Sequence, residues 1–183
     1  MGILLAFAPF IAFAVIERFA GGLAGLIAGT AVSAALILRE WMSARRTPKI
    51  LEVGTLILFG ALTLYTVLAD PTWSIFGIRL CVDAGLLLIV LASLALGRPF
   101  TLQYAREQVT RECWDRPEFI QTNYVITAVW ALAFVVMVAA DMTLLYAPAL
   151  PPRIGIIATI LAIVGAVKFT SWYPERQRTA AVS

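Results

Sequence analysis

The chain has 183 residues, of which 61% are hydrophobic and only 14% are charged, and its formal net charge is +3. Soluble domains are about 45–50% apolar and about 25% charged, and a soluble fold of this length could not bury so much apolar surface. The composition therefore excludes an ordinary soluble domain and predicts a membrane protein. The absence of histidine removes the commonest general base and a common ligand of metals and haem.

Six apolar runs follow one another along the chain, each near the length that crosses about 30 Å of hydrocarbon. The runs are continuous rather than alternating, which favours helices over a membrane β-barrel. We therefore predict an all-α bundle of about six transmembrane helices, forming a single domain over residues 1–183. The predicted spans are 3–17, 19–38, 50–69, 74–96, 122–146 and 153–173.

The first run is the shortest, and it ends at Glu17 and Arg18. We interpret Glu17 to Gly22 as a tight outer turn between two antiparallel helices. A single re-entrant hairpin is the alternative, so whether the first span crosses the membrane fully stays open at this point. The run lacks the positively charged segment that begins a signal peptide, and we expect it to belong to the membrane domain.

Basic residues are strongly biased to one side of the predicted helices. The opposite side holds only Arg18 and Arg153, with Arg79 just inside the membrane. By the positive-inside rule, this bias predicts a multi-pass inner-membrane protein with both termini cytoplasmic. The rule also explains the positive net charge, so we expect no nucleic-acid partner. The basic residues of the predicted inner side are Arg39, Arg45, Arg46, Lys49, Arg98, Arg106, Arg111, Arg116, Arg176 and Arg178.

The segment from Arg98 to Pro117, before the predicted fifth helix, is long enough to have structure of its own. Its apolar residues recur every three or four positions, opposite charged ones, which predicts a short amphipathic helix on the inner membrane surface. Pro99 and Pro117 mark its ends. A solvated connector is the alternative. The apolar positions are Leu102, Ala105, Val109 and Cys113.

Small residues recur at every fourth position of the predicted second helix, at Gly21, Gly25, Gly29 and Ser33. Residues with this spacing share one helix face and let two backbones approach closely, which favours helix packing in lipid. We interpret the stripe as a packing face within the bundle, and a seam between two copies of the chain is the alternative.

Five ionisable residues fall in the outer half of the predicted bundle: Asp70, Arg79, Asp83, Asp141 and Arg153. Arg79 and Asp83 are four positions apart on one predicted helix, so they share a face and we expect them to pair. Charges inside a membrane are costly and usually face the bundle interior or a water-filled cavity. The cluster is either a polar vestibule that binds a ligand or relays protons, or an ion-pair network that fixes the rotation of the helices.

The sequence contains no set of residues typical of an active site. It has no phosphate-binding glycine loop, no Ser-His-Asp set and no Cys-x-x-Cys motif. We therefore predict no enzyme activity, no cofactor and no metal site. Lys168, about one turn before the inner end of the last predicted helix, is expected to extend its ammonium group to the inner surface.

Several short stretches occur in a fixed order along nearly the whole chain. They are Ala8-Pro9-Phe10, Arg45-Arg46-Thr47-Pro48-Lys49, Leu58-Phe59-Gly60-Ala61-Leu62-Thr63-Leu64-Tyr65, Arg98-Pro99, Trp130-Ala131-Leu132-Ala133-Phe134 and Arg153. In this order they resemble the septation protein A family (YciB-type inner membrane-spanning proteins). The chain departs from the family pattern in three ways: its inner loop is longer, Thr127 stands where an asparagine is common, and Asp83 has no clear counterpart.

The resemblance implies an inner-membrane protein linked to cell-envelope integrity and septation. Such a protein would act through contacts with membrane lipids, with other membrane proteins or with its own copies, and the resemblance supplies no catalytic residues. Two functions of other classes stay open. One is a small transporter or proton-coupled channel with Arg79, Asp83 and Asp141 along its path. The other is an accessory subunit of a larger membrane complex.

Overall fold

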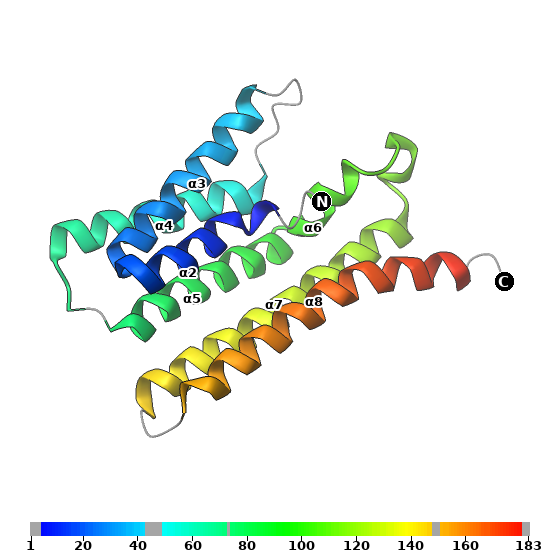
Figure 1. The fold of residues 1–183 in the computed structure, drawn as a ribbon. Coiled ribbons are helices and arrows are strands. Elements are labelled where there is room, and N and C mark those ends of the chain that lie inside the picture. The colour runs from blue at the N-terminus through cyan, green and yellow to red at the C-terminus, as the bar shows by residue number, and fades with distance from the viewer. Residues whose placement is uncertain (1–4, 43–48, 73, 148–150, 181–183) are drawn as a thin grey trace. The chain divides into compact units, whose positions relative to one another are not determined.

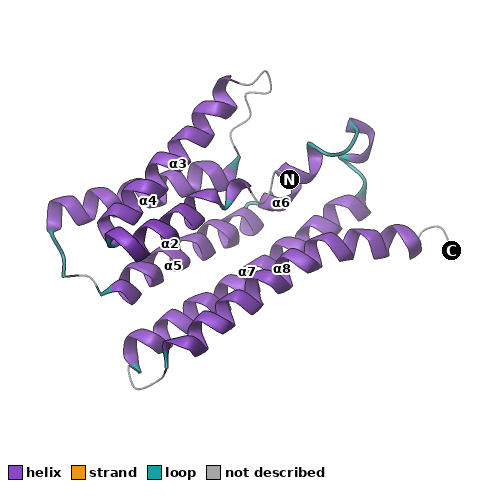
Figure 2. Cartoon of the chain, in the orientation of Figure 1, coloured by secondary structure: helices purple, strands orange, loops and turns teal. Residues whose placement is uncertain are grey.

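The computed structural model describes residues 5–42, 49–72, 74–147 and 151–180, and within these ranges the chain forms helices, turns and loops without a β-strand (Figures 1 and 2). The predicted all-α class is confirmed. In chain order the elements are α2 (Ala8–Ala20), α3 (Gly22–Met42), α4 (Ile50–Ala69), α5 (Ile75–Ala95), α6 (Phe100–Arg106), the 3-10 helix η1 (Arg111–Cys113), α7 (Pro117–Tyr146) and α8 (Pro152–Ala180).

Five of the described helices, α3, α4, α5, α7 and α8, are long and apolar enough to cross a membrane, which indicates a multi-pass membrane protein. The first predicted span is represented by α2, whose 13 residues extend over only about 20 Å. This is less than the hydrocarbon thickness of about 30 Å. Residues 3 and 4 of that predicted span lie outside the described residues. The count of six spans therefore stays a prediction.

The middle helices begin and end close to their predicted bounds, whereas the last two are longer than expected. α4 has the predicted bounds, and α5 differs from its prediction by one residue at each end. α7 begins at Pro117, five residues early, because a proline fits the first turn of a helix, where its missing N–H has no partner to lose. α8 continues beyond residue 173 with Pro174 inside it.

The chain folds as two compact units, residues 1–89 and 90–183. The prediction of a single domain is not tested by this division. In the first unit, α3 packs against both α2 and α4 (Figure 1). The centre of its core is Phe59, which is fully buried and whose ring lies 5.1 Å from the ring of Phe10 and 5.8 Å from that of Phe13. The buried members of this core are Phe13, Leu26, Phe59, Ile78 and Val82.

In the second unit, α7 and α8 lie side by side and α6 packs against α7 (Figure 1). The buried indole of Trp130 on α7 donates a hydrogen bond of 2.9 Å to the hydroxyl of Thr170 on α8. The buried hydroxyl of Thr101 on α6 is 2.7 Å from the hydroxyl of Thr127 and donates a bond of 2.9 Å to the carbonyl of Asn123, both on α7. Hydrogen bonds between helices therefore supplement the apolar packing of this unit.

The connection between α2 and α3 is a single residue, Gly21, with a φ of +88°. Glycine populates positive φ readily because it has no Cβ. The predicted turn over Glu17 to Gly22 is therefore too long, since Glu17 lies inside α2. Gly21 is also wrongly predicted as the first member of the small-residue stripe, because it is the turn residue and not part of α3.

The loop between α5 and α7 contains a helix, but a shorter one than the predicted amphipathic helix. α6 ends at Arg106, and most of its residues are buried. The chain then turns back, and the indole of Trp114 donates a 3.1 Å hydrogen bond to the carbonyl of Arg106. The guanidinium carbons of Arg106 and Arg111 lie 5.4 Å and 5.7 Å from the centre of the same indole. These contacts end the helix early, and the position of this segment on the membrane surface stays a prediction.

Candidate functional site

The first unit contains a buried ion pair between Glu17 on α2 and Arg79 on α5. The Arg79 Nε atom lies 3.2 Å and 3.0 Å from the two carboxylate oxygens of Glu17, and one terminal nitrogen lies 2.9 Å from Oε2. Such a pair with two-point contact is among the stronger charge-assisted interactions in proteins. The Glu17 side chain is 1% exposed and that of Arg79 is 30% exposed, so the carboxylate depends on the arginine for compensation.

The burial of Glu17 follows from the close packing of α2 against α3. A Cβ atom at Gly25 would lie 2.8 Å from the Cβ of Glu17, closer than real atoms approach. At Gly29 a Cβ would lie 2.6 Å from the ring of Phe59. These two glycines therefore let α2 and α4 approach the backbone of α3 closely. Ser33, the last residue of the predicted stripe, is buried as well.

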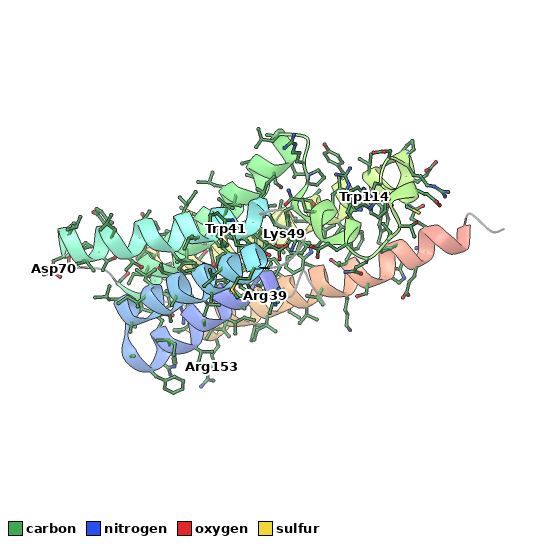
Figure 3. All side chains as sticks on the ribbon, turned by 90° about the horizontal axis from the view of Figure 1, so that it is seen from above. Arg39, Trp41, Lys49, Asp70, Trp114 and Arg153 are labelled. Carbon is green, nitrogen blue, oxygen red and sulfur yellow. The ribbon has the colours of Figure 1, made fainter. Side chains whose placement is uncertain are left out.

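The remaining members of the predicted outer cluster lie in both units. Asp70 is exposed and ends α4 with a φ of +41°, and it lies at the opposite end of that helix from Lys49 (Figure 3). Asp83 is half-buried on α5, four residues after Arg79, and their predicted pairing stays a prediction. In the second unit, Asp141 is buried on α7 and Arg153 is exposed at the start of α8. The cluster as a whole is therefore not tested.

A second group of buried charges lies between the end of α3 and the start of α4. The ammonium nitrogen of Lys49 lies 3.4 Å from Oε1 of Glu40 and 3.5 Å from Oε1 of Glu52. All three residues are less than 9% exposed. The sequence predicts Lys49 in an inner loop, and the structure places it in the segment before α4, with its side chain buried in this ionic cluster. Arg45 and Arg46 of the same predicted loop lie outside the described residues.

Between these two ionic groups, hydroxyl groups connect α3 with α4. The Thr30 Oγ1 atom lies 3.0 Å from Oγ1 of Thr63, and it also donates to the carbonyl of Leu26. Thr55, near Glu52 on α4, is buried and donates to the Glu52 carbonyl. The first unit thus carries ionisable groups near both ends of its helices and hydroxyl groups in between. These contacts connect α2 with α5 and α3 with α4.

The residues that sequence reasoning missed are the glutamates. Glu17 was assigned to a turn, and Glu40 and Glu52 were not singled out at all. The available signal was their position, since Glu52 falls three residues into an apolar run and Glu17 ends another. An acidic residue at such a place is costly unless it has a partner. Within the described ranges, no three His, Cys, Asp or Glu residues are grouped so that they could hold a metal ion.

Comparisons with known proteins identify no relative of this chain. No family model, no curated protein and no solved structure matches the chain.

Proposed function

We propose that this chain is a non-enzymatic, multi-pass protein of a bacterial inner membrane that supports cell-envelope integrity or septation through contacts with lipids and other membrane proteins. The proposed mode of action is supported by the apolar surface that the chain leaves exposed. Only 11% of the spanning part of α8 is buried, and its side chains Ile157 and Leu161 are 55% and 66% exposed. Lipid or a protein partner must cover such a surface.

The cellular process in this proposal comes from the sequence resemblance to the septation protein A family, and the orientation comes from the basic residues. Both termini are proposed to be cytoplasmic. A fusion of green fluorescent protein to the C-terminus should fluoresce, whereas a fusion of alkaline phosphatase at the same place should be inactive. The reverse result would place the C-terminus outside and refute the orientation.

Deletion of the protein from its host tests the process. The deletion strain should show altered cell shape or septum placement and increased detergent sensitivity, and the wild-type chain should reverse both. Arg79→Met, which disrupts the buried ion pair, should complement poorly, and the exposed Arg18→Met should complement fully. A strain with unchanged morphology and detergent resistance, together with a protein that purifies from native membranes without any partner, would refute the proposal.

The partner recovered in that purification separates the proposal from a role as an accessory subunit. Isolation from native membranes in a mild detergent, followed by mass spectrometry, identifies what binds the exposed helix faces. Envelope or division proteins support the proposal. Recovery in fixed stoichiometry with a respiratory or photosynthetic complex would instead assign the chain to that complex.

The buried ionisable groups of the first unit favour a second candidate, a small transporter or proton-coupled channel. This function requires a hydrated path that reaches Asp83, which is half-buried next to the Glu17–Arg79 pair along α5. Proteoliposomes with a trapped pH-sensitive dye would reveal proton flux. Asp83→Asn should abolish the flux, and Asp70→Asn, a change at an exposed acid, should leave it intact. Equal flux in protein-containing and empty liposomes would exclude proton transport.

A further inference from the structure

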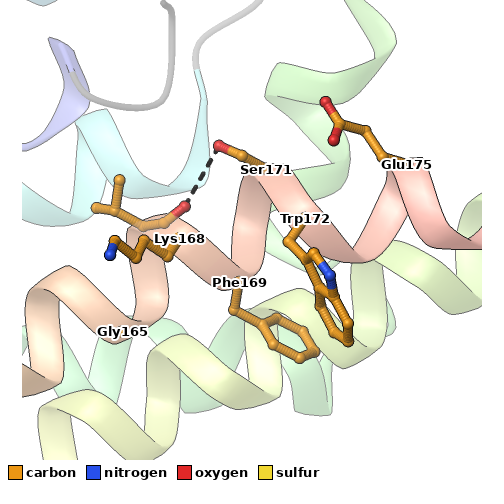
Figure 4. Close-up of a pocket in the computed structure, with 7 residues that line it drawn as sticks. Gly165, Lys168, Phe169, Ser171, Trp172 and Glu175 are labelled. Atoms are coloured by element: carbon orange, nitrogen blue, oxygen red, sulfur yellow. Dashed lines mark hydrogen bonds between the residues drawn. The ribbon is translucent and has the colours of Figure 1, made fainter.

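A groove of about 660 Å³ runs along the C-terminal part of α8, within the second unit (Figure 4). Its volume falls in the range of about 300–1,000 Å³ that is usual for small-molecule sites. The groove is open at the helix surface, and its wall is mostly apolar. The lining residues are Gly165, Val167, Lys168, Phe169, Ser171, Trp172 and Glu175.

The floor of the groove exists because residue 165 has no side chain. A Cβ atom built at Gly165 would meet nothing within 4 Å, so the space beside the helix is empty there. The ring of Phe169 borders it one turn further and packs against the rings of Trp172 and Tyr173, with centroid distances of 5.9 Å and 5.0 Å. This packing orients an aromatic wall along the apolar part of the groove.

The polar groups of the groove are arranged in a definite order along α8. Lys168 comes first and is exposed, Ser171 and Trp172 follow one turn later, and Glu175 is last. With a rise of 1.5 Å per residue, Lys168 and Glu175 are about 10 Å apart along the helix axis. From the apolar middle of α8 towards its charged end, the groove therefore offers an apolar surface, a cation, a hydroxyl with an indole, and a carboxylate.

We propose that this groove binds one aminophospholipid, with an acyl chain along Gly165 and Phe169, the phosphate at Lys168 and the primary ammonium group towards Glu175. The order of groups in such a lipid, from chain to phosphate to ammonium, is the order of complementary groups along the helix. Lysine is a common phosphate ligand, and tryptophan favours the boundary between lipid and water. The indole of Trp172 is held there by Arg176, whose guanidinium carbon lies 5.1 Å from its ring centre.

Glu175 decides between lipid classes. A carboxylate at the headgroup end favours a lipid that carries a primary ammonium group over one with a neutral glycerol headgroup. It also favours the primary ammonium over a choline group, which has no N–H to donate. This inference specifies the lipid contacts of the proposed function and rests on the chain being a membrane protein. Lipid binding by purified protein is measured without a cell, so its failure is distinguishable from failure of the envelope role.

Native mass spectrometry of the full chain in mild detergent, titrated with phosphatidylethanolamine, phosphatidylglycerol or phosphatidylcholine of identical acyl chains, tests the proposal. We expect one phosphatidylethanolamine bound about tenfold more tightly than either other lipid, as one extra charge-assisted hydrogen bond provides. Lys168→Met should weaken all three lipids about tenfold, because each carries a phosphate. Glu175→Gln should remove the preference for the primary ammonium group.

Gly165→Leu fills the groove and has a matched control. Gly60 on α4 also has nothing within 4 Å of a built Cβ, so Gly60→Leu makes the same change on a helix surface without this groove. Gly165→Leu should abolish specific binding, and Gly60→Leu should leave it unchanged; circular dichroism of both variants checks folding. Equal binding of the three lipids, a preference for phosphatidylglycerol, or equal effects of the two leucine variants would each overturn the proposal.

Discussion

Substitution of Arg79 by methionine tests whether the buried ion pair of the first unit holds its helices together. The change keeps an unbranched side chain on α5 but leaves the Glu17 carboxylate, which is 1% exposed, without the guanidinium that contacts both of its oxygens. Removing one partner of a buried pair costs about 3–5 kcal/mol. Because the Arg79 side chain is 30% exposed and water reaches it, we expect the lower end of this range, about 3 kcal/mol.

A loss of about 3 kcal/mol raises the equilibrium constant for unfolding by roughly a hundredfold. The assay is reversible unfolding in mixed micelles with increasing dodecyl sulfate, followed by far-ultraviolet circular dichroism. Arg18→Met, at an exposed position on the same helix as Glu17, is the control and should change stability by less than about 0.5 kcal/mol.

The double variant Glu17→Gln/Arg79→Met separates the cost of an isolated charge from the value of the pair. Without either charge, most of the lost stability should return, since a buried pair adds little over neutral groups of similar size. A loss below about 1 kcal/mol in Arg79→Met, or a double variant less stable than Arg79→Met, would refute the reasoning.

Three further substitutions test the packing, with stability measured in the same micelle titration. Gly29→Ala forces a methyl group against the aromatic ring beneath it and should cost about 1–3 kcal/mol, whereas Gly60→Ala, in open space, should stabilise by up to about 1 kcal/mol; equal effects would contradict the glycine contacts. Trp130→Phe removes the indole N–H that binds Thr170 and should cost about 1 kcal/mol, whereas unchanged stability would show that this bond contributes nothing. Thr101→Val removes two hydrogen bonds to α7 and should cost about 1–3 kcal/mol, with faster hydrogen exchange in α6; unchanged exchange would show that apolar contacts alone hold this helix.

Features that depend on local sequence could be predicted, and the prediction was best for the central helices. The bounds of α4 are those expected, because a long, mostly apolar run leaves the backbone in lipid no alternative to a helix. The continuation of α8 beyond residue 173 was not predicted, because the span was ended where the apolar run ends and a helix can continue past such a run. Pro174 also did not end the helix.

Features that depend on distant contacts could not be predicted. Spacing along one helix predicts a pair between Arg79 and Asp83, which stays a prediction. The pair of Arg79 with Glu17, 62 positions away in sequence, has no such local signal. The contacts of Lys49 with Glu40 and Glu52 could not be predicted either, because no local pattern indicates that the two acids approach it. In the segment between α5 and α7, periodicity predicted one helix, whereas α6 ends at Arg106 and the indole of Trp114 bonds back to the carbonyl of that residue.

The one-residue connection at Gly21 has a consequence for biogenesis. α2 and α3 are made one directly after the other, and the carboxylate of Glu17 is made with them. The arginine that pairs with it lies on α5, 62 positions later in the chain. The two helices can therefore pack against each other during synthesis before the ion pair forms, and α5 completes the pair when it is made.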